Sequence, residues 1–232
     1  MNDDVPATND DAPAPVHTES IRADGVVAQL DRPAVGASRA LVLLAHGAGS
    51  DRNSVLLRTL SAGMTARGLT VARIDLPYRQ QRPTGPPSPS KADADRAGIA
   101  AAIAVLAPLA PGGPLIVGGQ SYGGRQASML LAQDPGLADG LLLTSYPLHP
   151  PGKPEKLRVA HLGQVVTPTL IIHGRSDAFA TVDEIAEAAT LFAGPVEVIH
   201  IDRADHGLRP ERSGVGALTA AAVDEFFLGG TR

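Results

Sequence analysis

Short apolar runs alternate with helix-sized segments along most of this chain, and this alternation constrains its fold more than any other feature. Six runs have the length and composition of buried strands: ALVLLA at 40–45, TVARI at 70–74, PLIV at 114–117, GLLLT at 140–144, TLIIH at 169–173 and VEVIHI at 196–201. Helices are expected near 54–67, 91–109, 123–133, 183–193 and 216–227. The pattern is typical of a mainly parallel sheet with helices on both faces. We therefore predict an α/β fold, with one or two edge strands between 21 and 30.

Length and composition predict how the chain is divided. The 232 residues, 44% of them hydrophobic, are enough for one sizeable core. Residues 1–18 lack leucine and aromatic residues, so we expect a disordered tail followed by a single domain at 19–232. The tail has neither the basic start nor the apolar stretch of a secretory signal, and no uninterrupted apolar run is long enough to cross a membrane. We expect a cytoplasmic protein that has no membrane partner.

Charge and cysteine content exclude several function classes. The net charge of -4 comes without a cluster of Lys and Arg, which argues against a nucleic-acid partner. The absence of cysteine excludes disulfides, cysteine-ligated metals and a thiol nucleophile. The group His200, Asp202, Asp205 and His206 lacks further ligands in a recognisable spacing. We therefore expect neither a metal nor a cofactor.

A candidate nucleophile lies between a predicted strand and a predicted helix. Residues 119–123 have the sequence Gly-Gln-Ser-Tyr-Gly. The G-x-S-x-G pattern places its serine on a sharp, strained turn, and this geometry requires tiny residues two positions away on either side. We predict that Ser121 is a nucleophile. The alternative is a glycine-rich structural turn with an incidental serine.

Serine needs a base, and that base needs a carboxylate to orient it. Asp177 follows the TLIIH run and His206 follows the VEVIHI run. The order serine, acid, histidine is the order found in hydrolases that carry the G-x-S-x-G turn. Both residues also follow strands whose carboxyl ends should meet at one edge of the sheet, where open α/β sheets bind ligands. We predict a triad of Ser121, His206 and Asp177.

Acyl transfer by this triad also needs donors for a developing oxyanion. The backbone N–H of Tyr122, directly after the nucleophile, is the first candidate. The second should come from the HGAG segment that follows the ALVLLA run, with Ala48 preferred and Gly49 next. His46, the first residue of that segment, is expected to fix the loop.

The sequence constrains the substrate only weakly. Tyr78 and Tyr146 each follow a strand, and His149 lies in a proline-rich loop, so all three are candidates for substrate binding, although plain packing is an almost equal alternative. Arg125 has the chemistry to bind a substrate carboxylate, but an arginine early in a helix more often forms a structural pair or points to solvent, and we expect such a structural role here. The scarcity of aromatic residues favours small acyl groups.

Six motifs in order carry a resemblance to a known family: LLAHGAGSDRNS, RIDLPYRQQRP, GGQSYGGRQAS, SYPLHPPGKPEKLR, IIHGRSDAF and DHGL. From about residue 24 onward the chain resembles the α/β-hydrolase superfamily, and within it the small, cap-poor branch near dienelactone hydrolase. That enzyme uses a cysteine nucleophile, so here the resemblance implies serine chemistry and puts dienelactone in doubt as a substrate. Residues 145–168 leave no room for a large cap domain, which implies a shallow pocket walled by residues 76–90 and 146–156.

Together these observations predict a serine hydrolase, specifically a carboxylesterase. It would act on small carboxylic esters through an acyl-enzyme intermediate, as a monomer or homodimer. A non-catalytic binding or scaffold protein with the same fold is the alternative.

Overall fold

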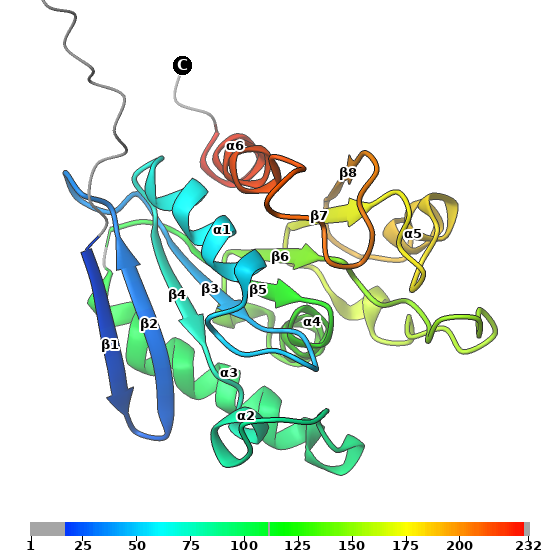
Figure 1. The fold of residues 1–232 in the computed structure, drawn as a ribbon, viewed down its shortest axis with the longest axis horizontal. Coiled ribbons are helices and arrows are strands. Elements are labelled where there is room, and N and C mark those ends of the chain that lie inside the picture. The colour runs from blue at the N-terminus through cyan, green and yellow to red at the C-terminus, as the bar shows by residue number, and fades with distance from the viewer. Residues whose placement is uncertain (1–16, 111, 230–232) are drawn as a thin grey trace, which may run out of the picture.

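One sheet runs through the part of the molecule that the computed structural model describes, residues 17–110 and 112–229 (Figure 1). Its eight strands lie in the order β1-β2-β4-β3-β5-β6-β7-β8. Their bounds are β1 (His17–Ala23), β2 (Val26–Arg32), β3 (Leu41–Ala45), β4 (Thr70–Ile74), β5 (Leu115–Gln120), β6 (Gly140–Thr144), β7 (Thr169–Gly174) and β8 (Val196–Ile201). The strands from β4 to β8 pair in parallel, whereas β1 and β2 are antiparallel. The predicted, mainly parallel sheet is confirmed.

The edge hairpin of β1 and β2 begins earlier than the sequence predicts. His17 and Thr18, expected in the disordered tail, are the first two residues of β1, and the rest of that tail lies outside the described residues. Residue 17 pairs with Arg32 across the hairpin, and the Thr18 hydroxyl donates to Asp31 at 2.9 Å. Most of β1 is exposed, so the strand is held by its backbone pairing with β2. Backbone pairing cannot be recognised from hydrophobic composition, which is why the start of β1 was not predicted.

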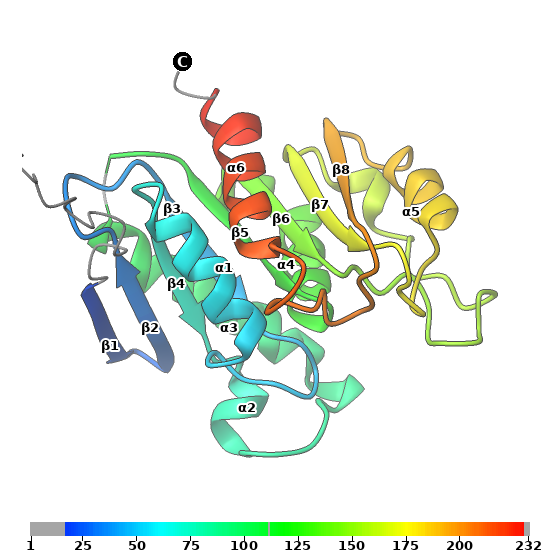
Figure 2. The same ribbon diagram turned by 45° about the horizontal axis from the view of Figure 1, so that its top comes forward.

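Helices cover both faces of the sheet (Figure 2). Their bounds are α1 (Val55–Thr65), α2 (Pro77–Gln81), α3 (Ala92–Leu106), α4 (Tyr122–Gln133), α5 (Val182–Ala189) and α6 (Val215–Leu228). The five predicted helices are confirmed with shifted ends, and the short α2 is additional. Serine is a common residue at the start of a helix, but Ser90 does not cap α3, because it lies within a short 3-10 helix before it.

Each central strand contributes to two cores. In β3, Leu41 and Leu43 face the core beneath α3, α4 and α5, while Val42 and Leu44 face the core beneath α1 and α6. This alternation explains why the strand is a continuous apolar run in the sequence. No helix in the described ranges is long and apolar enough to cross a membrane.

The topology brings four loops to one edge of the sheet. The loops after β3, β5, β7 and β8 all leave carboxyl ends of parallel strands. The register of β3 with β5 sets Ala45 opposite Gly119, so the loop after β3 lies beside the turn that follows β5.

Candidate active site

Ser121 occupies the strained turn between β5 and α4. Its backbone has φ 49 and ψ -112, a conformation that residues with a side chain rarely adopt. A Cβ on Gly119 would lie 2.1 Å from the Ala45 carbonyl oxygen, and one on Gly123 would lie 2.6 Å from the same atom. Both glycines are therefore required by close backbone approach, and the turn lifts the Ser121 hydroxyl off the sheet.

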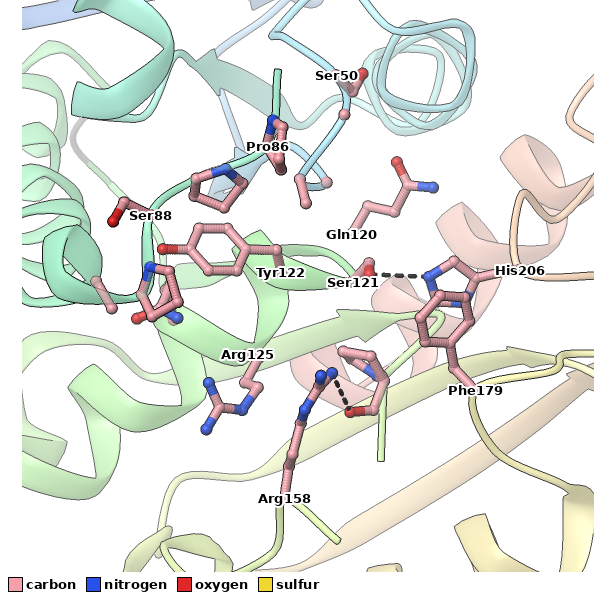
Figure 3. Close-up of a pocket in the computed structure, with 18 residues that line it drawn as sticks. Ser50, Pro86, Ser88, Gln120, Ser121, Tyr122, Arg125, Arg158, Phe179 and His206 are labelled. Atoms are coloured by element: carbon pink, nitrogen blue, oxygen red, sulfur yellow. Dashed lines mark hydrogen bonds between the residues drawn. The ribbon is translucent and has the colours of Figure 1, made fainter. Parts of the chain in front are cut away.

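The loops after β7 and β8 bring a carboxylate and an imidazole to this hydroxyl. His206 Nε2 lies 2.9 Å from Ser121 Oγ (Figure 3). On the other side of the ring, Nδ1 lies 2.9 and 2.8 Å from the two carboxylate oxygens of Asp177. A carboxylate only accepts, so Nδ1 carries the proton and Nε2 is left free to accept the serine proton. The structure thus joins the three residues that the sequence singled out.

Phe179, which was not predicted from the sequence, holds both Asp177 and His206. Asp177 is 5% exposed, and its Oδ1 also accepts the backbone N–H of Phe179 at 2.8 Å. The Phe179 ring stacks on the His206 ring, with 4.0 Å between centroids and 26° between planes. Its position two residues after the predicted acid places Phe179 in the same loop, but gives no information on where its ring points.

The loop after β3 presents its backbone to Ser121. The Tyr78 hydroxyl lies 2.8 Å from the Ala48 carbonyl oxygen and 3.2 Å from that of Gly47. In a trans peptide the N–H points opposite to the C=O, so the N–H groups of Ala48 and Gly49 are directed away from Tyr78. Both residues line the same pocket as Ser121 and Tyr122.

His46 fixes this loop from inside. Its Nδ1 donates to the Gly47 carbonyl at 2.8 Å, and its Nε2 accepts the Leu76 N–H at 3.2 Å. Burial lowers the pKa of His46, which favours the neutral ring that this pair of bonds requires.

A cavity of about 680 Å³ opens above Ser121 and His206. Pro86 and Arg158 lie on opposite sides of it (Figure 3), and Pro87, Pro89 and Pro147 also line it. The two predicted loop regions therefore supply walls, although Arg158 lies just beyond the second. The volume lies within the range of small-molecule sites.

The three residues predicted to bind substrate are not among the residues that line this pocket. Tyr78 is buried behind the loop after β3. Tyr146 is buried, and its hydroxyl donates to the Arg158 carbonyl at 3.3 Å. His149 faces Glu184 at 3.3 Å. Each follows a strand end as expected, but its side chain packs inward.

Arg125 also departs from expectation. Arg125 lines the pocket. Within residues 17–110 and 112–229 its guanidinium forms no ion pair, so it has no structural pair there. Gln126 and Arg158 line the same pocket and were not found from the sequence. Gln126 is adjacent to Arg125, and Arg158 ends the SYPLHPPGKPEKLR motif, but neither position indicated a role in the pocket.

The other acidic and histidine residues near β8 do not converge on a metal site. Asp202 pairs with Arg175 at 2.7 Å, and Asp205 pairs with Arg209 at 3.4 Å. Among the described residues, no group of three His, Asp or Glu side chains is arranged to hold a metal ion.

Comparisons with known proteins agree with this fold. A family model described as an alpha/beta hydrolase domain matches residues 38–225. The structure is similar to a dienelactone hydrolase from Anabaena variabilis, with TM-score 0.71 and 20% identity over 94% of this chain and 99% of that one. It is also similar to Est1E from Butyrivibrio proteoclasticus, with TM-score 0.69 and 15% identity over 92% and 98% of the two chains. A lidless serine hydrolase from Xanthomonas campestris, XC6422, matches with TM-score 0.66 and 14% identity over 92% and 94%. At these identities the likeness shows the fold.

Proposed function

The chain belongs to the α/β-hydrolase family, and we propose that it is a serine hydrolase, a carboxylesterase acting on small carboxylic esters. The observation that carries the proposal is the hydrogen-bonded series Ser121, His206, Asp177 at the base of a pocket. Every proposed catalytic group is carried by one sheet, so we also propose that the chain from residue 19 onward acts as one catalytic domain.

In the first half-reaction the Ser121 Oγ proton passes to His206 Nε2 while Oγ bonds to the ester carbonyl carbon. The carbonyl electron pair moves onto oxygen, where the N–H of Tyr122 and that of Ala48 or Gly49 stabilise it. When the carbonyl re-forms, the alcohol leaves with the proton from His206. An acyl group then remains on Ser121.

In the second half-reaction water replaces the alcohol. His206 Nε2 accepts a proton from water, and the oxygen attacks the acyl carbon. Collapse of the second intermediate breaks the bond to Oγ, and His206 returns the proton to Ser121. Throughout, Asp177 remains ionised and stabilises the imidazolium. Its burial and its bond from the Phe179 N–H hold it in place for this role.

The direct test is hydrolysis of p-nitrophenyl butyrate by Ser121→Ala. We expect kcat to fall by about 10⁴-fold or more, because removal of the nucleophile leaves only binding and oxyanion stabilisation. Ser20→Ala is the matched control, since Ser20 lies on the exposed edge strand β1. A fluorophosphonate probe should label wild type at Ser121 and leave the variant unlabelled.

Two outcomes contradict the proposal. Equal turnover by Ser121→Ala and wild type removes Ser121 from the chemistry. A wild-type protein that neither hydrolyses the ester nor takes the probe at Ser121 supports the non-catalytic binding or scaffold alternative.

A further inference from the structure

The pocket next to Ser121 is rich in hydrogen-bond donors and contains no acidic side chain among the described residues that line it. Its basic side chains are Arg125, Arg158 and His206. The imidazole is already engaged by Ser121 and Asp177, which leaves two guanidinium groups to account for. Arginine in a partly buried site usually has an anionic partner, because an unpaired charge is costly to remove from water.

Arg125 is fixed by its place in α4. It follows Ser121 by one helical turn, and its backbone N–H donates to the Ser121 carbonyl at 2.9 Å. Its Nε atom is buried and makes no hydrogen bond within the described ranges. The side chain therefore offers unused donors on the same side of the pocket as Arg158 (Figure 3).

Gln126 adds a second unused donor. The side chain is 0% exposed, and its Oε1 accepts from Arg96 Nη1 at 3.0 Å. Arginine only donates, so this bond fixes which end of the amide is oxygen. The Nε2 amide group is left buried without a partner in the described part of the chain. Gln126 is among the residues that line the pocket.

Arg158 is held in place but only partly engaged. Its backbone N–H donates to the Leu148 carbonyl at 2.7 Å, and its Nη1 donates weakly to the Pro147 carbonyl at 3.4 Å. Burial and the nearby charge of Arg125 lower the pKa of Arg158. Two cations that disfavour each other in one pocket would both gain from an anion between them.

Neighbouring groups do not neutralise this charge. The carboxylate of Asp95 already accepts from the Tyr78 N–H at 3.1 Å and the Tyr122 hydroxyl at 2.7 Å. Burial and the charge of Arg125 lower the pKa of His161 to about 4, so that imidazole is neutral at pH 7. Among the described residues no carboxylate pairs with either guanidinium, so an anion bound in the pocket would find both available.

We propose that the preferred substrate is an ester with a carboxylate on its acyl group, bound by Arg125 and Arg158 with help from Gln126. This inference rests on the proposed esterase function and names its substrate class: monoesters of dicarboxylic acids. His206 protonates the leaving alcohol, so the alcohol lies toward that residue. Arg125 lies on the other side of Ser121 (Figure 3), where the acyl chain extends. The guanidinium forks match the two oxygens of a carboxylate.

The test compares p-nitrophenyl monoesters of succinic, glutaric and adipic acids with p-nitrophenyl esters of the neutral acids of the same carbon number. Spontaneous hydrolysis is subtracted for each. The readout is the ratio of kcat/KM for the anionic ester to kcat/KM for its neutral counterpart. We expect wild type to prefer the anionic ester for at least one chain length. In Arg125→Gln and in Arg158→Gln that ratio should fall by about 10-fold or more, chiefly through KM, as expected for loss of a charge-assisted hydrogen bond.

Arg22→Gln is the matched control, because Arg22 lies in the edge strand β1. Its ratio should equal that of wild type. If wild type hydrolyses the neutral esters but prefers none of the anionic ones, the substrate class is wrong and the esterase function still stands. The same conclusion follows if the arginine variants have the wild-type ratio. If wild type hydrolyses neither kind of ester, the proposed function fails, and calorimetric titration of wild type with adipate tests the anion site alone. If adipate does not bind in that titration, the proposed anion site is wrong.

Discussion

At the scale of single residues, Tyr78 shows how a buried side chain that never reaches the pocket can act on the chemistry. Burial raises the pKa of Tyr78 to about 12, so its hydroxyl keeps its proton and remains a donor at neutral pH. That hydroxyl holds the carbonyl groups of Gly47 and Ala48. The N–H groups on the opposite side of the same peptides are the proposed oxyanion donors. Tyr78 is therefore a positioning residue.

Tyr78→Phe should lower kcat for p-nitrophenyl butyrate by about 10-fold with little change in KM. Complete loss of one oxyanion donor typically costs 10²- to 10³-fold, and a loosened loop costs less. Tyr146→Phe is the control, since it also loses a buried hydroxyl but lies away from the loop after β3. Steady-state kinetics of both variants check this. If the Tyr78 hydroxyl is only structural, like that of Tyr146, both variants will be less stable than wild type and both kcat values will stay near the wild-type value.

The residues that could be predicted from the sequence are those tied to strand ends. Ser121, Asp177 and His206 each follow a recognisable strand, so chain order alone brought them to one edge of the sheet. Phe179 and Arg158 could not be found this way. Their positions depend on the path of loops, which have no period, and on ring and guanidinium directions that only packing fixes.

At the scale of elements, the contact between α1 and α6 depends on glycines, which have no side chain. A Cβ on Gly63 would lie 2.3 Å from the Gly216 carbonyl oxygen, and one on Gly216 would lie 2.6 Å from that of Thr59. The helix backbones thus approach one another too closely for alanine. Hydrophobic pattern predicted both helices, but it carries no information on how near they come. The same limit explains α2, which is too short to show a period.

Gly63→Ala should therefore destabilise the protein, although alanine is favoured over glycine in a helix by about 1 kcal/mol. The clash is with backbone, which cannot move aside cheaply, and such overpacking costs about 1–3 kcal/mol. We expect a net loss of about 1 kcal/mol and a lower Tm in thermal unfolding. Gly136→Ala is the control, because its Cβ would meet only ordinary contacts. An unchanged or raised Tm for Gly63→Ala contradicts the close approach.

At the scale of the whole molecule, burial keeps several histidines neutral. Desolvation lowers the pKa values of His46, His161, His173 and His200. In the unfolded chain these rings take up protons near the ordinary value of 6.5. As the pH falls below that value, the unfolded state binds more protons than the folded state. The linkage relation then requires stability to decrease.

For His161 the window is defined, because its pKa falls from 6.5 to about 4. Its stabilising contribution is fully present above pH 6.5, decreases as the pH falls, and is lost near pH 4. Within that window one histidine contributes a slope of up to about 1.4 kcal/mol per pH unit. His161→Gln keeps a donor in the place of Nε2, which faces Ser128 at 2.8 Å, but cannot titrate. Urea unfolding at pH 7, 6 and 5 should give a shallower loss of stability for the variant than for wild type. The carboxylates titrate equally in both proteins, so the difference isolates the ring. Parallel pH profiles would show that folding does not lower the pKa of His161.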